Sequence, residues 1–436
     1  MSGWQNFKLG EIIEDVAMGP FGSNLKRDNF ITSGVPVIRG GNLNEGGFDD
    51  ELFVFVSEEK AQSLKRSLAY PDDLVFTHRG TIGQVGLIKK GKYPYYLVSQ
   101  SQVRLTVNKK FLDPKFLFYW FKSPIGQYEL LKNSAQVGVP SIASPTKSLK
   151  EIDISIPPLS TQKAIAEILS SLDDKIELNN QINQNLEALA QALFKQWFVD
   201  FEFPNENGEP YKSSGGEMVN SELGEIPKGW EVRTLEDISK LIRGISYRKH
   251  ELVEKEEGLP FINLKCFALD GTFRQDGLKY FNGKYKDHQI IQPNDILIAV
   301  TDLTQDRIVI GLPIIWSRRE AALPSLDVCI VRPKKNGLNN FLYYEFKTHR
   351  YKSRIIEFAN GSTVLHLSVK GLETYKFGVP PINLLNSWND CISPILERIE
   401  QNISENRELT NLRDTLLPKL ISGKLEVNQI EKEVYG

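Results

Sequence analysis

The sequence has few of the side chains on which metal sites and nucleophilic catalysis depend. Its 436 residues include 3 cysteines and 5 histidines. Cys266, Cys329 and Cys391 lie far apart and form no CxxC pair, which argues against a zinc site or a disulfide framework and is typical of the reducing cytosol. The histidines are scattered without metal-ligand spacing. We therefore expect no metal on this chain and a cytoplasmic location.

Long apolar runs and a leader sequence are also missing. No run approaches about 18 apolar residues, so we expect no segment to span a membrane. The first residues, Met1-Ser-Gly-Trp4, lack the basic and apolar pattern of a signal peptide.

Sequence motifs of common catalytic sites are absent as well. There is no GxxxxGK[ST] phosphate loop, no HExxH helix and no GxSxG nucleophile elbow. The Pro-Pro pairs after Ile156 and Val379 lack the polar residue and the aromatic that hold a flipped base in DNA amino-methyltransferases. Pro71-Asp72 and Asp113-Pro-Lys115 match a nuclease set only loosely, and the second repeat does not preserve it. We therefore expect no catalytic residue.

What the sequence does contain is a long internal repeat, with landmarks returning about 223–227 residues later. Pro36-Val-Ile38 returns as Pro260-Phe-Ile262, and Phe116-Leu-Phe-Tyr119 returns as Phe341-Leu-Tyr-Tyr344. Solenoid repeats have periods of about 20–50 residues, so this repeat indicates a duplicated domain. The predicted division is a first domain (1–158), a first helix (159–203), a linker (204–227), a second domain (228–381), a second helix (382–425) and a tail (426–436).

Each repeat mixes short strands with an aromatic helix. The strand-like runs of the first repeat are Pro36–Arg39, Leu52–Val56, Leu74–Thr77, Gln84–Ile88 and Val103–Val107, followed by a helix at Lys115–Phe121. Those of the second are Pro260–Asn263, Asp295–Val300, Ile308–Pro313 and Val328–Arg332, followed by a helix at Phe341–Phe346. The pattern predicts an α+β fold with two pseudo-symmetric mixed domains and a partly antiparallel sheet in each.

The net charge of −2 hides an uneven distribution along the chain. Residues 1–150 and 231–380 each carry a net charge of +5, whereas 151–230 carry −9 and 381–436 carry −3. One interpretation is two phosphate-facing domains joined by segments that do not touch DNA. Ordinary surface variation explains the same values equally well.

A long helix is predicted after each Pro-Pro pair, over 161–199 and 385–420, with Ser160 or Thr161 as N-cap of the first. Apolar residues recur at coiled-coil spacing, and two asparagines interrupt each seam at matching positions. The seam residues are Ile165, Leu169, Leu172, Ile176, Asn179, Asn183, Leu186 and Leu193 in the first helix, and Ile395, Ile399, Asn402, Asn406, Leu409 and Leu416 in the second. We expect the helices to pair with each other; the alternative is that each packs on its own domain with solvated asparagines.

Glycine-bounded polar loops supply the candidate DNA contacts, because amides suit adenine and arginine suits guanine. In the first domain they are Ser23, Asn24, Lys26, Arg27, Arg39, His78, Arg79, Thr81, Gln100, Gln102, Gln136 and Ser141. In the second they are Arg243, Tyr247, Arg248, Lys249, Lys265, Thr301, Gln305, Arg307, Ser362, Thr363 and His366. For any single residue, simple exposure remains the alternative.

Three further segments complete the pattern: Leu193-Phe-Lys-Gln-Trp-Phe-Val-Asp-Phe201, Gly224-Glu-Ile-Pro-Lys-Gly-Trp230 and Leu416-Leu-Pro-Lys-Leu-Ile-Ser-Gly-Lys-Leu425. With the alternation of basic domains and acidic helices, the chain resembles the specificity subunit of a Type I restriction–modification system over essentially its whole length. The resemblance implies that each repeat reads one half of a split, asymmetric DNA site and that the helices pair in antiparallel fashion.

The resemblance also implies partners. Two modification subunits would dock on the helices and carry S-adenosylmethionine and adenine methylation, and restriction subunits would add ATP- and Mg-dependent translocation and cleavage. This chain would bind no cofactor. A helix over 161–199 would be roughly 58 Å long. At about 3.4 Å per base pair, half-site centres would lie no more than about 17 base pairs apart, with about one helical turn expected.

Two other interpretations stay open at this point. One is the recognition region of a fused restriction–modification enzyme, although the repeats use the whole length. The other is a non-catalytic scaffold whose domains bind protein, with an incidental basic balance.

Overall fold

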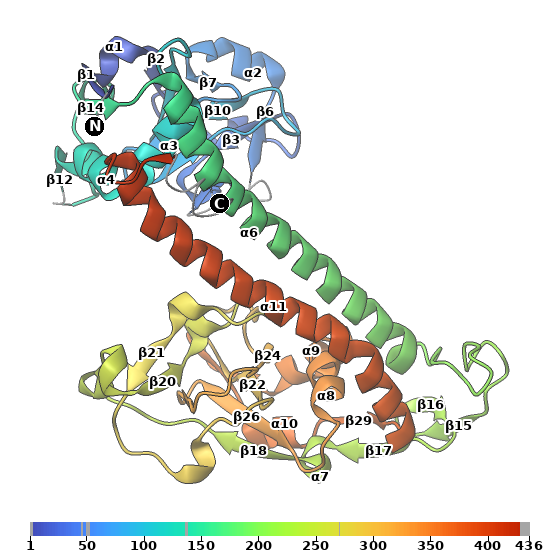
Figure 1. Cartoon of the computed structure of the whole chain (residues 1–436). Coiled ribbons are helices and arrows are strands. Elements are labelled where there is room, and N and C mark those ends of the chain that lie inside the picture. The colour runs from blue at the N-terminus through green and yellow to red at the C-terminus, as the bar shows by residue number, and fades with distance from the viewer. Residues whose placement is uncertain (1–2, 45–46, 49–52, 136–137, 270, 428–436) are drawn as a thin grey trace. The chain divides into compact units, whose positions relative to one another are not determined.

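The computed structural model spans 1–436, and the structure describes 3–44, 47–48, 53–135, 138–269 and 271–427. The chain forms two compact units: Met1–Asn179 with Ser404–Gly436, and Asn180–Ile403 (Figure 1). Each unit therefore contains one repeat and a part of both long helices.

The first repeat contains two four-stranded sheets. One has the order β2-β11-β8-β9 and is antiparallel: β2 Ile13–Met18, β11 Gln102–Val107, β8 Leu74–Thr77 and β9 Val85–Leu87. The other has the order β6-β3-β10-β7 and pairs β3 with β10 in parallel: β6 Val54–Val56, β3 Val35–Ile38, β10 Tyr96–Val98 and β7 Leu68–Ala69. The central strands are buried apolar runs, which is why their side chains form the core.

Shorter elements complete the first repeat. The strands β1 Gln5–Lys8 and β14 Asp153–Ile156 pair, as do β4 Leu43–Asn44 with β5 Gly47–Phe48 and β12 Ser134–Ala135 with β13 Ser141–Ile142. The helices are α1 Leu9–Ile12, α2 Glu58–Ser63, α3 Pro114–Lys122, α4 Pro124–Leu131 and α5 Pro145–Lys150. The Asp113 side chain caps α3 by accepting a hydrogen bond from the Phe116 backbone N–H (3.0 Å), which explains where this aromatic helix begins.

The second repeat has the same plan. Its antiparallel sheet runs β18 Ser239–Arg243, β26 Val328–Pro333, β22 Ile296–Ala299 and β24 Pro313–Ile315, and its mixed sheet runs β19 Leu252–Val253, β21 Lys279–Phe281, β20 Leu259–Ile262 and β25 Leu323–Pro324. A third sheet joins β23 Thr301–Asp302, β28 Leu365–Leu367 and β27 Ala359–Asn360. The remaining elements are β17 Glu231–Thr234 with β29 Lys376–Val379, α7 Leu235–Ile238, α8 Asn339–Glu345, α9 His349–Ile355 and α10 Val369–Glu373. The predicted α+β fold is confirmed.

The duplication extends to single backbone positions. A Cβ atom at Gly19 would lie 1.8 Å from the Ser99 carbonyl oxygen, and one at Gly244 would lie 1.8 Å from that of Ser325. The Gly19 and Gly244 backbone N–H groups donate to the carbonyl groups of Gln102 and Val328, at 2.9 and 3.1 Å. Only glycine fits a backbone approach this close, so both repeats depend on it at this turn.

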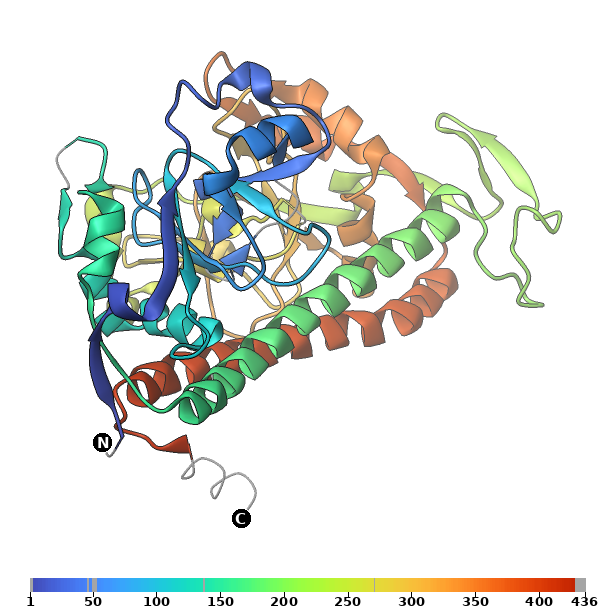
Figure 2. The same cartoon turned by 90° about the horizontal axis from the view of Figure 1, so that it is seen from above.

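Two long helices follow the repeats: α6 Leu159–Phe194, continued by a π-helical turn Lys195–Val199, and α11 Ile382–Ile421. Their stretches within each unit lie side by side (Figures 1 and 2). The expected N-cap at Ser160 or Thr161 is wrong, because α6 already begins at Leu159. The Pro158 carbonyl accepts from the Gln162 N–H (3.0 Å), so the helix starts directly after the Pro-Pro pair.

Polar contacts join the two helices in the first unit. The Asn179 side-chain amide donates to the Asn406 Oδ1 atom (2.9 Å) and to the Glu405 carboxylate (2.8 Å). Further along, Arg413 donates to the Asp173 carboxylate (2.7 Å). Residue numbers fall along α6 as they rise along α11, so the helices are antiparallel, as predicted.

The second unit holds the matching contact, in which the Asn402 amide donates to the Asn183 Oδ1 atom (2.8 Å). An aromatic cluster extends the pairing of the helices. The ring centroid of Trp388 lies 5.6 Å from that of Phe194 and 5.7 Å from that of Trp197. The asparagine interruptions of the two seams therefore meet each other, which favours helix pairing over solvated asparagines. Packing on the domains occurs too, since Ile165 and Leu169 share a buried cluster with Phe116.

One predicted strand is also absent from the described residues, and the predicted linker contains secondary structure. The run Ile308–Pro313, predicted as a strand, is a loop up to β24, because Gly311 turns with φ 80° and hydrogen bonds hold the Val309 and Ile310 N–H groups. The predicted linker 204–227 contains a hairpin, β15 Met218–Ser221 with β16 Gly224–Pro227, because the residues between the strands form a tight turn. Among the residues that the structure describes, no helix is both long and apolar enough to cross a membrane.

Candidate nucleic-acid interface

In the first domain the sheet topology brings the predicted contact loops to one end. The strands β2 and β8 end where β11 begins, since Met18 and Phe76 both pair with Val103. The parallel strands β3 and β10 end together, and the Ser99 N–H donates to the Ile38 carbonyl (2.9 Å). The loops that follow β2, β3, β8 and β10 therefore gather at one end of the sheets.

A network of uncharged side chains supports these loops. The Thr77 hydroxyl donates to the Gln84 Oε1 atom (2.9 Å), and the Gln84 amide donates to the Leu43 carbonyl (2.6 Å). The Gln102 amide donates to the Thr77 hydroxyl (3.4 Å), while the Ser99 hydroxyl donates to the Gln102 Oε1 atom. Gln102 is fully buried, so it supports the loops and does not face a ligand, contrary to the prediction from sequence.

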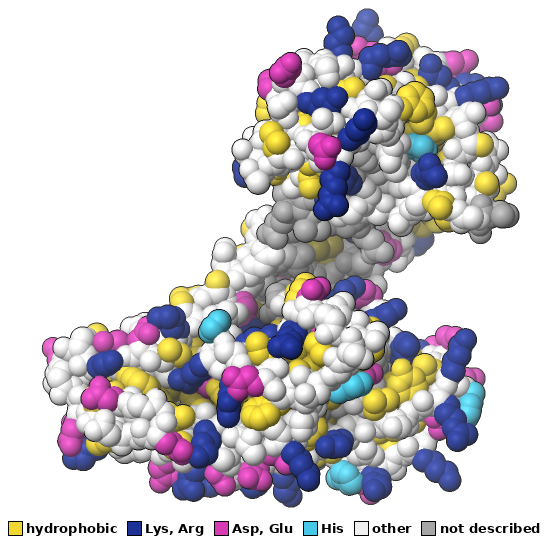
Figure 3. Space-filling model, turned by 180° about the vertical axis from the view of Figure 1, so that it is seen from behind, with side chains coloured by type: hydrophobic (Ala, Val, Ile, Leu, Met, Phe, Trp, Pro, Cys, Tyr) yellow, Lys and Arg dark blue, Asp and Glu magenta, His cyan; other side chains and the backbone are white. Residues whose placement is uncertain are grey.

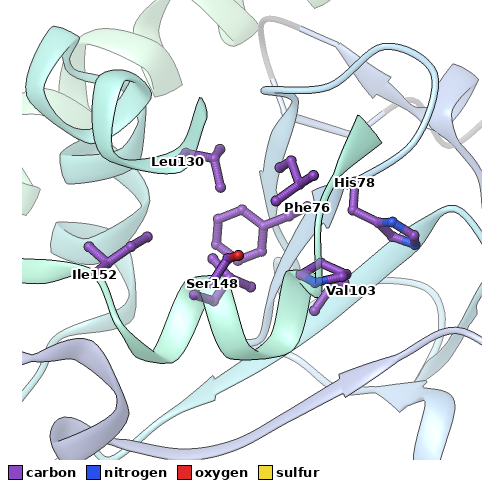
Figure 4. A pocket seen from close by; sticks show the side chains of 9 residues that line it. Phe76, His78, Val103, Leu130, Ser148 and Ile152 are labelled. Carbon is purple, nitrogen blue, oxygen red and sulfur yellow. The ribbon is translucent and has the colours of Figure 1, made fainter. Parts of the chain in front are cut away.

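His78 is also mostly buried. Its Nε2 atom lies 3.0 Å from the Gln100 carbonyl, and burial lowers the pKa of the imidazole. Its side chain lies at one side of a small cavity of about 10 Å³, around which Phe76, Leu130, Ser148 and Ile152 close (Figure 4). That volume holds about one water molecule at most, so the cavity does not receive a base. The polar contact of the His78 ring with the loop is therefore the one with the Gln100 carbonyl.

Most other predicted residues of the first domain lie on the surface. Ser141 is half-buried and pairs with Arg79 in a β-bridge. Gln136 lies outside the described residues. The exposed residues are Ser23, Asn24, Lys26, Arg27, Arg39, Arg79, Thr81 and Gln100.

The second domain gathers the equivalent loops at the corresponding end. Thr301 pairs with His366 across β23 and β28, with 3.3 Å between the Thr301 Oγ1 and His366 Nδ1 atoms. Arg243 ends β18, and its carbonyl accepts from the Gln289 amide (3.1 Å). Thr301 is buried and Tyr247 half-buried; the exposed residues are Arg243, Arg248, Lys249, Lys265, Gln305, Arg307, Ser362, Thr363 and His366.

A buried carboxylate organises the loop after β23. One oxygen of Asp302 accepts from the Thr304 N–H and hydroxyl (both 2.9 Å), and the other accepts from the N–H groups of Val309 (2.9 Å) and Ile310 (3.3 Å). Burial by itself would raise the pKa of Asp302, but these hydrogen bonds outweigh it and hold the pKa below its ordinary value. The loop carrying Gln305 and Arg307 is therefore held around one negative charge.

The second domain also has a larger hollow at this end. A cavity of about 310 Å³ is lined by Arg243, Thr301, Leu326, Cys329, His366 and Ser368, with Val300, Val328, Leu367 and Val369. Its lining combines three predicted contact residues with apolar walls. Burial raises the pKa of the Cys329 thiol to about 12, so this cysteine lines the cavity as a neutral group.

Charged side chains are spread over the face that Figure 3 shows. On the face in Figure 3, Lys and Arg side chains are scattered, with Asp and Glu side chains between them. The described residues contain no group of three or more His, Cys, Asp or Glu side chains placed to hold a metal ion. What the loops offer is a set of hydrogen-bonding and cationic side chains of the kind that contact phosphates and base edges.

Comparison with known proteins shows the family of the chain. A family model described as Type I restriction modification DNA specificity domain matches 1–188 and again 227–412. The chain belongs to this family. The two matched stretches cover both repeats and most of both long helices, so the family match also reports the duplication.

Named relatives and a solved structure extend the comparison. The chain is 29% identical over 385 residues to the Type I restriction enzyme MjaIX specificity subunit of Methanocaldococcus jannaschii, covering 86% of this chain and 82% of the relative. It is 24% identical to the HindI specificity subunit of Haemophilus influenzae, covering 98% and 100%. A crystal structure of a Type I system S subunit from M. genitalium aligns with a TM-score of 0.53 at 17% identity over 96% of each chain, which supports the fold.

Sequence reasoning missed two residues that shape the loops. Gln84 holds the loop after β3 in the first domain, and Asp302 holds the loop after β23 in the second. Asp302 had a detectable signal, because Asp followed two residues later by Thr favours a local turn. Gln84 had none, since its partner Leu43 is distant in sequence.

Proposed function

We propose that this chain is the DNA-recognition subunit of a Type I restriction–modification complex, in which the first domain reads one half of a bipartite, asymmetric site and the second domain reads the other half. The observation that carries the proposal is that one backbone frame occurs twice with different loop side chains at the same end. The first domain presents Arg79 and Gln100 there, whereas the second presents Arg243 and His366. Different side chains on equal frames are suited to different half-sites.

The long helices α6 and α11 set the gap between half-sites and dock two modification subunits in this proposal. The chemistry belongs to those partners: S-adenosylmethionine and adenine methylation on the modification subunits, ATP and Mg on restriction subunits. This chain supplies the DNA address, binds no cofactor and catalyses no step. A role on chromosomal DNA places it in the cytoplasm.

The test is to co-express the chain with its modification subunit and map methylated adenines genome-wide by single-molecule sequencing. We expect one bipartite motif with a fixed gap, and no new methylation from the modification subunit alone. A stable complex without new methylation would contradict the proposal and favour a protein scaffold. Exchanging 1–158 for the corresponding domain of a relative should change one half of the motif, and a change in both halves would contradict modular recognition.

A further inference from the structure

Phe21 is the most exposed large hydrophobic side chain among the residues that the structure describes, at 76% exposure. Single exposed apolar residues are common on protein surfaces and by themselves indicate nothing. Phe21 differs because of how it is held and what surrounds it.

The turn that carries Phe21 is fixed by a backbone contact at Gly19, and the Gln100 side chain lies beside it at Gly22. Gly19 lies so close to the Ser99 carbonyl that no side chain fits, and a Cβ atom at Gly22 would lie 2.7 Å from the Gln100 Oε1 atom. Pro20, between these two glycines, is buried. The Asn24 backbone N–H donates a hydrogen bond to the Phe21 carbonyl (2.8 Å), which closes the turn. The backbone therefore holds the ring outward before any ligand binds, which reduces the entropy lost on binding.

Exposed polar and cationic side chains flank the ring. Ser23, Asn24, Lys26 and Arg27 follow it directly, with one acidic residue, Asp28, among them. Gln100 lies beneath the same turn. Cations beside a projecting apolar ring match the arrangement of proteins that contact phosphates and insert a wedge between bases.

The second domain shows that the fold does not require an exposed ring here. Gly244 makes the same close approach to Ser325, but it is followed by buried Ile245 and exposed Ser246. The nearby aromatic, Tyr247, turns inward, with its ring centroid 5.0 Å from that of Phe261. The same close approach of the glycine thus forms with serine at the position of Phe21.

We infer that Phe21 inserts into a base step of the half-site read by the first domain, partly unstacking it, while the second domain reads its half-site without such a wedge. The inference rests on the proposed function and adds to it a means of reading DNA deformability. Pyrimidine–purine steps unstack most easily. The half-site of the first domain should therefore contain a TA or CA/TG step at the position that Phe21 reaches.

The experiment uses the full chain in complex with its modification subunits and a duplex that carries the motif found by methylation mapping. Replacing the adenines of the first half-site with 2-aminopurine, one at a time and leaving out the adenine that is methylated, since methyltransferases flip their target base, reports unstacking as a rise in fluorescence on binding. We expect a rise at one step with the native protein and no rise with Phe21→Ala. Affinity should fall on the order of 10- to 100-fold, since stacking on a base is worth about 1–3 kcal/mol.

Two variants separate this inference from loss of folding or of recognition. Phe111→Ala removes an equally large, 47% exposed ring beyond the opposite end of β11 and should leave affinity and fluorescence unchanged. Phe21→Leu keeps an apolar wedge and should retain most of the affinity. The wedge is refuted, while the proposed function stands, if the native complex binds its bipartite site and Phe21→Ala binds that site equally well with the same fluorescence as the native complex. If the native complex recognises no bipartite site, the proposed function fails.

Discussion

In the first domain, an uncharged network of Thr77, Gln84 and Gln102 lies beneath the candidate DNA-contact loops, whereas in the second domain the Asp302 carboxylate gathers the corresponding loop. The backbone beneath both is nearly the same, down to the glycine that meets a serine carbonyl. The comparison teaches that the frame and the loop supports are separable. A duplicated sheet can keep its hydrogen bonds while the side chains that shape the loops, and with them the surface offered to DNA, diverge.

The strongest test of the shared backbone frame is to add a methyl group where each glycine lies closest to the facing serine carbonyl. Gly19→Ala and Gly244→Ala should each lower the free energy of unfolding by about 3 kcal/mol, because the new Cβ atom meets backbone that has no room to move. Gly41→Ala is the matched control, since a Cβ atom there meets nothing within 4 Å. Urea unfolding measures all three. Equal stability of Gly244→Ala and the native protein would break the equivalence of the two turns.

The next test concerns the charged support in the second domain. Asp302→Ala leaves buried N–H groups without an acceptor and should cost about 2 kcal/mol, with recognition lost in one half-site only. Asp306→Ala, on an exposed residue of the same loop, is the control. Weakened recognition of both half-sites would contradict the separation of the two domains.

The same carboxylate predicts a pH dependence. The pKa of Asp302 is lower in the folded state than in the unfolded chain, so its stabilisation is present above the ordinary aspartate pKa. It is lost as the pH falls through the lower, folded-state value. The stability of the native protein should therefore fall more steeply with acid than that of Asp302→Asn, whose uncharged amide cannot titrate. Parallel stability–pH curves for the two proteins would contradict this.

A smaller effect compares how each domain is attached to α6. The Tyr119 hydroxyl donates to the Asp173 carboxylate (2.6 Å), and the equivalent Tyr344 hydroxyl donates to Glu187 (3.2 Å). Tyr119→Phe should cost about 1.5 kcal/mol and Tyr344→Phe less, because the longer bond is weaker and Lys347 also pairs with Glu187. Tyr128→Phe, on a 70% exposed ring, is the control in thermal unfolding. A larger loss from Tyr344→Phe would reverse this comparison.

The smallest effect should be a gain. The Oδ1 atom of Asn402 is buried without a hydrogen-bond partner among the described residues. Asn402→Leu should therefore raise stability by about 1 kcal/mol, since half-buried Asn183 can turn to water for its lost bond. Asn179→Leu should gain less, because the Glu405 carboxylate also loses a donor. A fall in stability for Asn402→Leu would show that the asparagine pair stabilises the helices.

Much of the fold could be predicted from sequence because its strands are short apolar runs between turn residues. Leu74–Thr77 was predicted with the bounds of β8, and the aromatic helix Lys115–Phe121 lies within α3. The error at Ile308–Pro313 has a physical cause: the apolar run favours a strand, but Asp302 captures its N–H groups. The conformation of that segment is set by a carboxylate several residues away, and the local pattern of apolar residues contains no information about that contact.

The candidate site was less predictable residue by residue. Polar residue type does not distinguish a side chain that faces DNA from one that supports a loop. Gln102 and Gln100 are two positions apart, yet one is fully buried and the other exposed, because Gln102 begins strand β11 whereas Gln100 lies in the turn before it.

The sequence by itself determined the duplication and the pairing of the two helices, because both depend on the spacing of residues along the chain. The resemblance of its segments to a known family indicated the family and the antiparallel direction of the helix pair. The matching interruptions of the two seams, at Asn179 and Asn402, were enough to predict that the helices pair with each other. Only the tertiary structure decided which polar residues support the loops and which face outward, and that the ring of Phe21 is held in solvent. Those outcomes depend on where distant backbone groups, such as the Ser99 and Leu43 carbonyls, come to lie when the strands assemble.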